Sequence, residues 1–211
     1  FKIRLNHRQL LRSMMVASGI DQGHETAALV AVDKLDKIGD GGVREELAAR
    51  GIPGESANIL MELILMAEAD VLLSLSKHIT DSEGVAAIAE LHQIINLLSV
   101  TPAGPHVSLS LDLARGLGYY TGAIFEITVP DLAGSLGGGG RYDNLVGMFG
   151  NHKLSGVGFG MGDVTLRNFL ETHKLLPASG GAVDVLVTLP SSSYVACPRM
   201  SRAPCARPGS R

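Results

Sequence analysis

The sequence predicts an α+β fold in which a β-sheet domain is interrupted by an all-helical insertion. Three observations support this prediction. A strand-like stretch, Phe1–Leu5, opens the chain, helix-type patterns fill residues from about 7 to 100, and strand-type patterns return from Val107 to Phe149. Because a strand precedes the helical block, an insertion in a sheet domain fits better than a separate N-terminal helical domain.

Composition and charge exclude several classes of protein. Hydrophobic residues make up 45% and charged residues 18% of the 211 residues, which is typical of a globular protein rather than a disordered one. No apolar run reaches the ~18 residues that a membrane span needs, so we expect no membrane association. The net charge is −3, and the last 21 residues carry four arginines and no acid. The rest of the chain is therefore acidic, which argues against a general nucleic-acid-binding surface.

Cysteine usage and the start of the chain give two further expectations. Both cysteines, Cys197 and Cys205, lie in the basic tail, so the body has no disulfide framework and no thiolate metal site. An intracellular, cytoplasmic protein is the simplest interpretation. The chain starts with FKIRL and without an initiator methionine, which we interpret as the sign of a fragment.

Helices are predicted throughout the first half of the chain by apolar positions three and four residues apart. The predicted helices are His7–Ala17 with Asn6 as N-cap, Glu25–Ile38, Val43–Arg50, Glu55–Ala67, Val71–His78 and Ser82–Leu98. Residues 39–42 should break the chain, and the charges of Asp33–Lys37 should form a solvated face with i,i+3 and i,i+4 pairs. The apolar face of the last helix should hold Val85, Ile88, Leu91, Ile95 and Leu98. No histidine spacing suggests a metal site.

The stretch after the helices alternates in a period of two. Val107, Leu109, Leu111 and Leu113 are apolar with polar residues between them, which predicts a strand with one buried face. A turn at residues 115–118 leads into a second β-rich run, Tyr119–Val129. The simplest interpretation is a β-hairpin with Arg115 at its tip, although a bulge near Ala114 could turn the arginine toward either face. Tyr119 and Tyr120 are consecutive, so on a strand they should face opposite ways.

Glycines dominate the next segment. A run such as Gly137–Gly140 is either flexible or lies where something must approach the backbone closely. A short helix at Asn144–Phe149, a strand at Ser155–Met161 and a helix at Val164–Lys174 with Asp163 as N-cap should follow. A helix N-terminus of this kind suits phosphate binding.

The final segment contains one more expected element. Residues 177–181 read as a linker and Val183–Leu189 as a strand. From Ser191 the pattern is lost, which indicates either a disordered tail or an artefactual end.

Two of these segments resemble a known family. RGLGYYTG at residues 115–122, followed by GGGGRYDNLVG at 137–147, resembles the two signature segments of histidyl-tRNA synthetases. DKLDK at 33–37 is similar to part of the helical insertion in some of those enzymes, and GVGFGMGDVTL at 156–166 sits where class II synthetases carry their third motif. The resemblance covers roughly residues 1 to 189. RGLGYYTG is highly specific, whereas a glycine-rich run alone would be weak.

The resemblance implies an internal fragment with the antiparallel sheet and flanking helices of a class II synthetase. Residues 1–6 and 105–176 would be part of the catalytic domain, and residues 7–104 would be the helical insertion domain. Residues 177–190 would be a linker and the first strand of the anticodon-binding domain, and residues 191–211 an irregular or artefactual tail.

The resemblance also implies a function and its residues. The full-length protein would use ATP to activate L-histidine and transfer it to tRNA(His), with Mg²⁺ accompanying ATP, and would act as a cytoplasmic homodimer. Arg115 would be catalytic and would contact the histidine carboxylate and the α-phosphate. The residues implied in histidine binding are Arg115, Tyr119, Tyr120, Gly139, Gly140 and Tyr142, and those implied in ATP binding are Gly158, Gly160 and Gly162.

Residue types alone leave alternatives open at the same positions. Arg115 suits a developing phosphate charge or a structural salt bridge equally well. A tyrosine pair is more often packing than binding. For Asp143 a local ion pair with Arg141 that stabilises the turn is the favoured interpretation.

The sequence departs from the family pattern in two places. Gly118 stands where an acidic residue is common, and Val164-Thr165 stand where the third motif has a Glu-Arg pair, with Arg167 shifted by two. Nothing resembles the first and second motifs, so the chain alone should not charge tRNA. The alternative is a non-catalytic histidine-binding paralogue, such as the regulatory subunit of ATP phosphoribosyltransferase. The altered third motif favours that paralogue, whereas intact RGLGYYTG and the helical insertion favour the synthetase.

Overall fold

The computed structural model describes residues 1–66, 70–114, 118–130, 134–150, 152 and 154–177. In these residues a five-stranded sheet has the order β2-β1-β3-β4-β5, and every neighbouring pair is antiparallel except the parallel pair β1 and β2. The strands are β1 (Lys2–His7), β2 (Val107–Leu109), β3 (Ala123–Thr128), β4 (Ser135–Tyr142) and β5 (Gly156–Met161). The predicted α+β class is confirmed.

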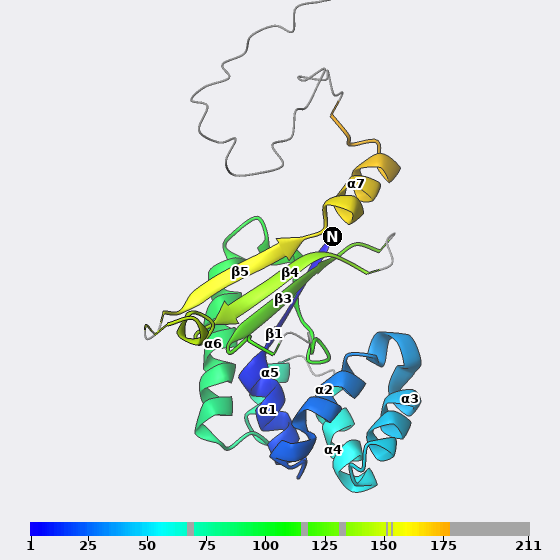
Figure 1. Cartoon of the computed structure of the whole chain (residues 1–211), viewed down its shortest axis with the longest axis vertical. Helices are drawn as coiled ribbons and strands as arrows, with labels where there is room; N and C mark the ends of the chain where they lie inside the picture. Colours follow the sequence, from blue (N-terminus) through cyan, green and yellow to red (C-terminus); the bar gives the residue numbers. More distant parts are fainter. Residues whose placement is uncertain (67–69, 115–117, 131–133, 151, 153, 178–211) are drawn as a thin grey trace, which may run out of the picture.

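Helices α1 to α5 gather beyond one end of the sheet, and α7 extends from the other end (Figure 1). The helices are α1 (Arg8–Ala17), α2 (Glu25–Val32), α3 (Leu35–Ala49), α4 (Gly54–Ile64), α5 (Val71–Leu75), α6 (Ser82–Ser99) and α7 (Asp163–Thr172), and short 3₁₀ turns occupy Gln22–His24, Gly104–His106 and Val146–Met148. The last turn replaces the predicted short helix at Asn144–Phe149. None of the described helices has both the length and the apolar character needed to cross a membrane.

The predicted β-hairpin is wrong, because β1 lies between its two arms. Strand β1 pairs with β2 through one edge and with β3 through the other. After β2 ends at Leu109, the backbone is held along β1 by the buried side chain of Asn6, whose Nδ2 donates to the carbonyls of Leu111 and Leu113, both at 3.0 Å. Arg115, the predicted tip, lies outside the described residues.

Both predicted N-caps are off by one residue. Strand β1 continues through His7, whose Nδ1 accepts a hydrogen bond from the backbone N–H of Gln9 at 3.1 Å and so caps α1. Asn6 is committed to the sheet and does not cap. At the other end of the chain Gly162 is the N-cap of α7, and Asp163 falls in the first turn instead.

The predicted helix Glu25–Ile38 is divided into two. Helix α2 ends at Val32, and α3 starts at Leu35 and is kinked at Gly39, where φ is 70°. The predicted break is thus confined to one glycine, because the helix resumes directly after it. Asp33, Asp36 and Lys37 are exposed, as the predicted solvated face requires. Two ion pairs of this segment reach beyond it, because Lys34 binds Glu46 at 2.9 Å and Asp36 binds Arg4 of β1 at 2.9 Å.

The apolar face of α6 is rotated from the predicted one. Ile88 and Leu91 are buried as expected, but Val85 is half exposed. Gly84 is buried in its place, and a Cβ at this glycine would come within 2.6 Å of the Ser13 Cβ of α1. The close approach of α1 and α6 therefore selects small residues for the contact. One apolar core runs from these helices to Leu5 and Ile124 of the sheet, and the proposed division at residues 7 and 104 stays a prediction.

The Asn6 side chain should dominate the stability of the sheet. Replacing Asn6 with Ala leaves two carbonyls without their donor in a buried site, so we expect a loss of about 2–4 kcal/mol in the free energy of unfolding. The matched control is Asn96→Ala on the exposed side of α6, which should change it by less than ~0.5 kcal/mol. Urea denaturation of both variants measures the difference, and equal stabilities would show that the Asn6 hydrogen bonds do not hold β1 in place.

Candidate functional site

A cavity of about 360 Å³ lies over β4 and β5, and we define it as the tyrosine cavity. Its lining residues are Tyr119, Tyr120, Gly138, Tyr142, Leu145, Gly158, Phe159 and Gly160. Four aromatic residues line it, and three of them are tyrosines from two separate segments that meet above two neighbouring strands. The tyrosine cavity therefore brings residues of both signature segments together.

The floor of the tyrosine cavity is made of glycines that face each other across the strands. In the register of β4 and β5, Gly138 lies opposite Gly160, Gly140 opposite Gly158 and Tyr142 opposite Gly156. Residues directly opposite each other share a face of the sheet. One face of these two strands thus has almost no side chains.

The tyrosine rings occupy the space that this glycine face leaves. A Cβ on Gly158 would lie 2.8 Å from the Tyr142 hydroxyl, and a Cβ on Gly140 would lie 2.8 Å from Cδ1 of Tyr120. Of the two interpretations of the glycine run, close approach to the backbone is the one observed. At Gly160, by contrast, a Cβ would meet no atom of the described structure within 4 Å, so this position opens onto the cavity.

Tyr119 and Tyr120 were predicted to face opposite ways on a strand, and this prediction is wrong. They precede β3 in a segment without strand geometry, so their rings turn to the same side and contact each other with centroids 4.7 Å apart. Tyr119 also meets Tyr142 edge to face at 5.9 Å. Tyr120 is 6% exposed and Tyr119 37%, so one ring is fixed in the core while the other remains accessible.

A pair of polar residues, Thr121 and Asp143, fixes the two tyrosine segments to each other. The Thr121 hydroxyl donates to Oδ2 of Asp143 at 2.7 Å, and the backbone N–H of Asp143 donates to the same hydroxyl oxygen at 3.1 Å. Thr121 directly follows Tyr120, and Asp143 directly follows Tyr142. The reciprocal hydrogen bonds therefore set the relative positions of these two rings.

Electrostatics reinforce the contact between Thr121 and Asp143. The hydrogen bond from Thr121, followed by one from Ser155, lowers the pKa of Asp143 below its ordinary value. Arg141 binds Asp143 at 3.0 Å, which confirms the predicted local ion pair. Thr121 was not among the predicted site residues. The one signal for it in the sequence is that a polar residue directly follows a tyrosine in both segments.

The predicted site residues are distributed as follows. Tyr119, Tyr120, Tyr142, Gly158 and Gly160 converge on the tyrosine cavity, so residues assigned separately to histidine and to ATP line the same space. Gly139 and Gly140 lie in β4 but do not belong to the lining. Gly162 caps α7, and its N–H donates to the Leu136 carbonyl at 3.0 Å. Arg115 lies outside the described residues.

The arginine near the third motif is paired along its own helix. Arg167 Nε lies 2.8 Å from Oε1 of Glu171, and its side chain is 72% exposed. Val164, in the first turn of α7, is also exposed. The first turn of α7 thus offers no cation of its own to the tyrosine cavity.

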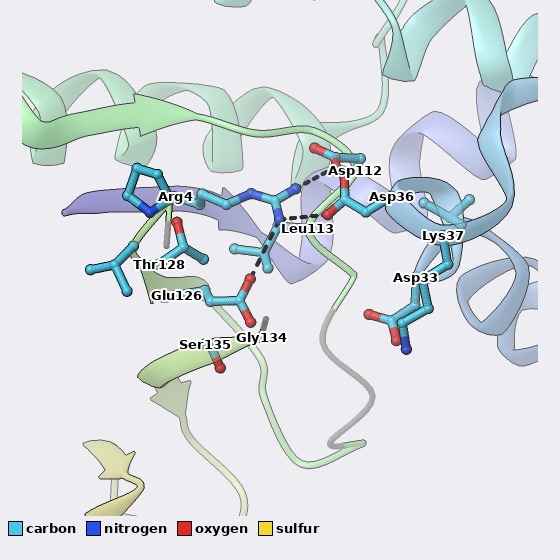
Figure 2. Close-up of a pocket in the computed structure, with 13 residues that line it drawn as sticks. Arg4, Asp33, Asp36, Lys37, Asp112, Leu113, Glu126, Thr128, Gly134 and Ser135 are labelled. Carbon is cyan, nitrogen blue, oxygen red and sulfur yellow. Dashed lines mark hydrogen bonds and ion pairs between the residues drawn. The ribbon is translucent and has the colours of Figure 1, made fainter. Parts of the chain in front are cut away.

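A larger cavity of about 930 Å³ surrounds Arg4 on the same face of the sheet. Figure 2 shows the Arg4 guanidinium at the centre of three carboxylates, with Asp36 at 2.9 Å, Glu126 at 3.5 Å and Asp112 in direct contact. Burial lowers the pKa of Arg4, but Asp112 and Asp36 outweigh burial and raise it above its ordinary value. Three carboxylates already engage Arg4, so this residue acts as a structural link between β1, β3 and α3. The tyrosine cavity is therefore the stronger candidate site.

Comparison with known proteins identifies the relatives of this chain. The family model described as histidyl-tRNA synthetase matches residues 1–164. A histidine–tRNA ligase from Bacteroides fragilis is 41% identical over 180 residues, which are 83% of this chain and 39% of the relative. The corresponding ligase from Leptospira biflexa is 36% identical over 206 residues, 93% of this chain and 44% of the relative.

Solved structures agree with these matches. A histidyl-tRNA synthetase from Nostoc sp. PCC 7120 superposes with a TM-score of 0.74 at 29% identity, over 83% of this chain and 43% of that one. A Bacillus halodurans protein described as an ATP phosphoribosyltransferase regulatory subunit/histidyl-tRNA synthetase gives 0.64 at 23% identity, over 76% of this chain and 41% of that one, and shows the shared fold alone.

These matches define the class first: the chain is part of the aminoacyl-tRNA synthetase group of ligases. Within that class, it belongs to the histidyl-tRNA synthetase family. The chain spans about two fifths of the length of the curated relatives that it matches.

The contact between Thr121 and Asp143 should be measurable as stability. In Thr121→Val both hydrogen bonds are lost, and we expect the free energy of unfolding to fall by about 1–2 kcal/mol. Thr121→Ser keeps the hydroxyl and should retain most of it, while Thr26→Val on the exposed side of α2 serves as the control.

The loss in Thr121→Val should also depend on pH. Folding lowers the pKa of Asp143, so the stabilisation is present above about pH 4, the pKa of an unfolded aspartate, and is lost as pH falls through the lower folded pKa. Denaturation curves at neutral and acid pH check this. A Thr121→Ser variant as unstable as Thr121→Val would show that the hydroxyl is not the stabilising group.

Proposed function

We propose that this chain supplies the histidine-binding side of an enzyme that activates L-histidine with ATP and transfers it to tRNA(His). The observation that supports this most is the convergence of Tyr119, Tyr120 and Tyr142 on one cavity over a glycine floor. A flat imidazole ring suits such a space, because it can lie against the aromatic rings while hydroxyl groups hydrogen-bond its nitrogens. A pocket that pairs with those nitrogens rejects apolar amino acids, whose binding would leave its polar groups unpaired.

Arg115 is the proposed catalytic group. In the first step the histidine carboxylate attacks the α-phosphate of ATP, the phosphoanhydride bond breaks and pyrophosphate leaves. Negative charge grows on the phosphate oxygens during this step. Arg115 stands four residues before Tyr119 in the sequence, and a guanidinium that contacts both carboxylate and α-phosphate would orient the attack and offset that charge.

ATP is proposed to extend along β5 toward the start of α7. Gly158, Gly160 and Gly162 would let the nucleotide approach the backbone there. Mg²⁺ is expected to accompany the ATP phosphates. Among the described residues no cluster of His, Cys, Asp and Glu is arranged to hold a metal ion, and no step proposed for this chain depends on one.

The remaining parts of the proposal follow from family membership. The full-length enzyme is proposed to bind tRNA(His), to form a homodimer and to act in the cytoplasm. The described residues supply the tyrosine cavity.

A non-catalytic histidine-binding subunit is a second candidate. It is favoured by one observation: Val164 and Thr165 take the third-motif positions, and Arg167, the nearest cation, is paired with Glu171. Both candidates bind histidine at the tyrosine cavity. Only the ligase catalyses exchange of pyrophosphate into ATP in the presence of histidine, so that assay separates them.

Substitutions at Arg115 should lower turnover in the full-length protein. Because the phosphate charge grows toward the transition state, Arg115→Ala should cost ~3 kcal/mol, roughly a hundredfold in histidine-dependent pyrophosphate exchange, with a smaller change in KM. Arg115→Lys should recover part of the rate, since it keeps the charge and loses the planar fork. Tyr120→Phe should instead act mainly on the KM for histidine.

Arg50→Ala is the control for these measurements, because Arg50 pairs with Glu46 on α3, far in sequence from the signature segments. Near-normal turnover of folded Arg115→Ala would reduce Arg115 to a structural residue. Absence of exchange in the unmodified full-length protein, together with retained histidine binding, would favour the regulatory subunit.

A further inference from the structure

Next to the tyrosine cavity is a second, more polar space of about 370 Å³, which we define as the arginine cavity. Its lining residues are Arg8, Gln9, Arg12, Glu25, Gly118, Tyr120, Thr121 and Asn144. Tyr120 lines both cavities. A molecule bound in one cavity would therefore adjoin a molecule bound in the other.

The charges around the arginine cavity are not balanced. Arg8 and Arg12 are one helical turn apart on α1, and Glu25 is the one acidic residue in the lining. Arg12 Nε donates to Oε2 of Glu25 at 3.0 Å. The three side chains together leave one net positive charge, and Glu25 is already engaged by Arg12.

Arg8 is the under-satisfied member of this group. Its side chain is only 15% exposed, and its nearest acidic contact, Nη2 to Oε1 of Glu25, is 3.7 Å, longer than a hydrogen bond. Across the described residues no hydrogen-bond acceptor is found for its guanidinium, which has five N–H donors. The same residues contain no fully buried side-chain nitrogen or oxygen without a partner, so the free donors of Arg8 open onto the cavity.

The position of Arg8 is fixed independently of Glu25. It is the first residue of α1, and its backbone N–H donates to the Gly122 carbonyl at 2.9 Å. Burial lowers the pKa of its guanidinium, although an arginine remains charged in proteins. A partly buried cation with unused donors and a fixed backbone is poised to accept an anion, since each new charge-assisted hydrogen bond would offset the cost of burial.

We propose that the arginine cavity binds a phosphate group, held by Arg8 and Arg12 beside Tyr120. The planar fork of a guanidinium matches phosphate oxygens. Asn144 adds a polar residue to the lining, whereas the side-chain Nε2 of Gln9 already donates to Oε2 of Glu83. This inference rests on the proposed function for the source of the phosphate. Two substrates of that function carry phosphate groups, the nucleotide and the RNA, and either could place one next to an amino acid in the tyrosine cavity.

The first experiment titrates this chain with pyrophosphate and follows the Arg8 Nε–H and the Gln9 amide by NMR. We expect saturable shifts whose affinity falls as KCl rises, because the contact is ionic. Arg8→Met should weaken binding at least tenfold and Arg8→Lys less, whereas Arg50→Met should leave it unchanged, since Arg50 binds Glu46 on α3.

A variant that gains affinity guards against simple loss of folding. In Glu25→Gln the acidic competitor is removed while the shape is kept, so pyrophosphate should bind several-fold more tightly. Binding that is absent, or that is unaffected by both Arg8→Met and Glu25→Gln, would overturn the proposal.

Two further arms identify the source of the phosphate. ATP and a short single-stranded RNA are each tested as competitors of pyrophosphate in the unmodified chain and in Arg8→Met. If ATP or the RNA competes with pyrophosphate in the unmodified chain and this competition is lost in Arg8→Met, the result supports the site and identifies its ligand. If neither competes with pyrophosphate, the result contradicts the proposal. Histidine binding is measured on the same samples: its absence with retained pyrophosphate binding would overturn the proposed function and leave the phosphate site standing.

Discussion

Strand β1 is the element on which the rest of the structure depends, because segments that follow it by more than a hundred residues use both of its edges. Its Asn6 side chain holds the carbonyls of Leu111 and Leu113, and its Arg4 joins carboxylates from three other segments. These contacts close a long loop that contains α1 to α6. The entropy of closing such a loop must be offset by contacts formed at its ends. The hydrogen bonds of Asn6 and the ion pairs of Arg4 are contacts of this kind.

The tyrosine cavity depends on a different constraint, the absence of side chains from one face of β4 and β5. Glycine weakens a strand, because it loses more conformational entropy on folding and offers nothing to pack. Here β4 lies between β3 and β5, so its backbone is paired on both edges. The rings of Tyr120 and Tyr142 cover Gly140 and Gly158, while Gly160 is left open. The glycines thus leave room above the sheet for aromatic rings and a ligand.

The sequence predicted the elements well and their partners less well. Periodicity located the helices and strands because it reflects which face of an element is buried, and the signature segments located Tyr119, Tyr120 and Tyr142. Alternation at residues 107–113 could not show that β1 would lie between the two β-rich runs, because a period of two carries no information on which strand is adjacent. Thr121 and Arg8 were missed for a related reason. Thr121 pairs with Asp143, which lies 22 positions away in the sequence, and the proposed role of Arg8 comes from a charge that the surrounding residues leave unmatched.

The tyrosines themselves allow the most direct test of histidine binding. The chain has four tyrosines and no tryptophan, and three of the four line the tyrosine cavity, so its intrinsic fluorescence reports mainly on this site. L-Histidine should change the fluorescence saturably and L-leucine should not. Gly160→Val, which fills the open floor position, should abolish the change, whereas Gly41→Val, at an equally open position of α3, should preserve it. No response to histidine, or the same response in Gly160→Val, would contradict a histidine site in the tyrosine cavity.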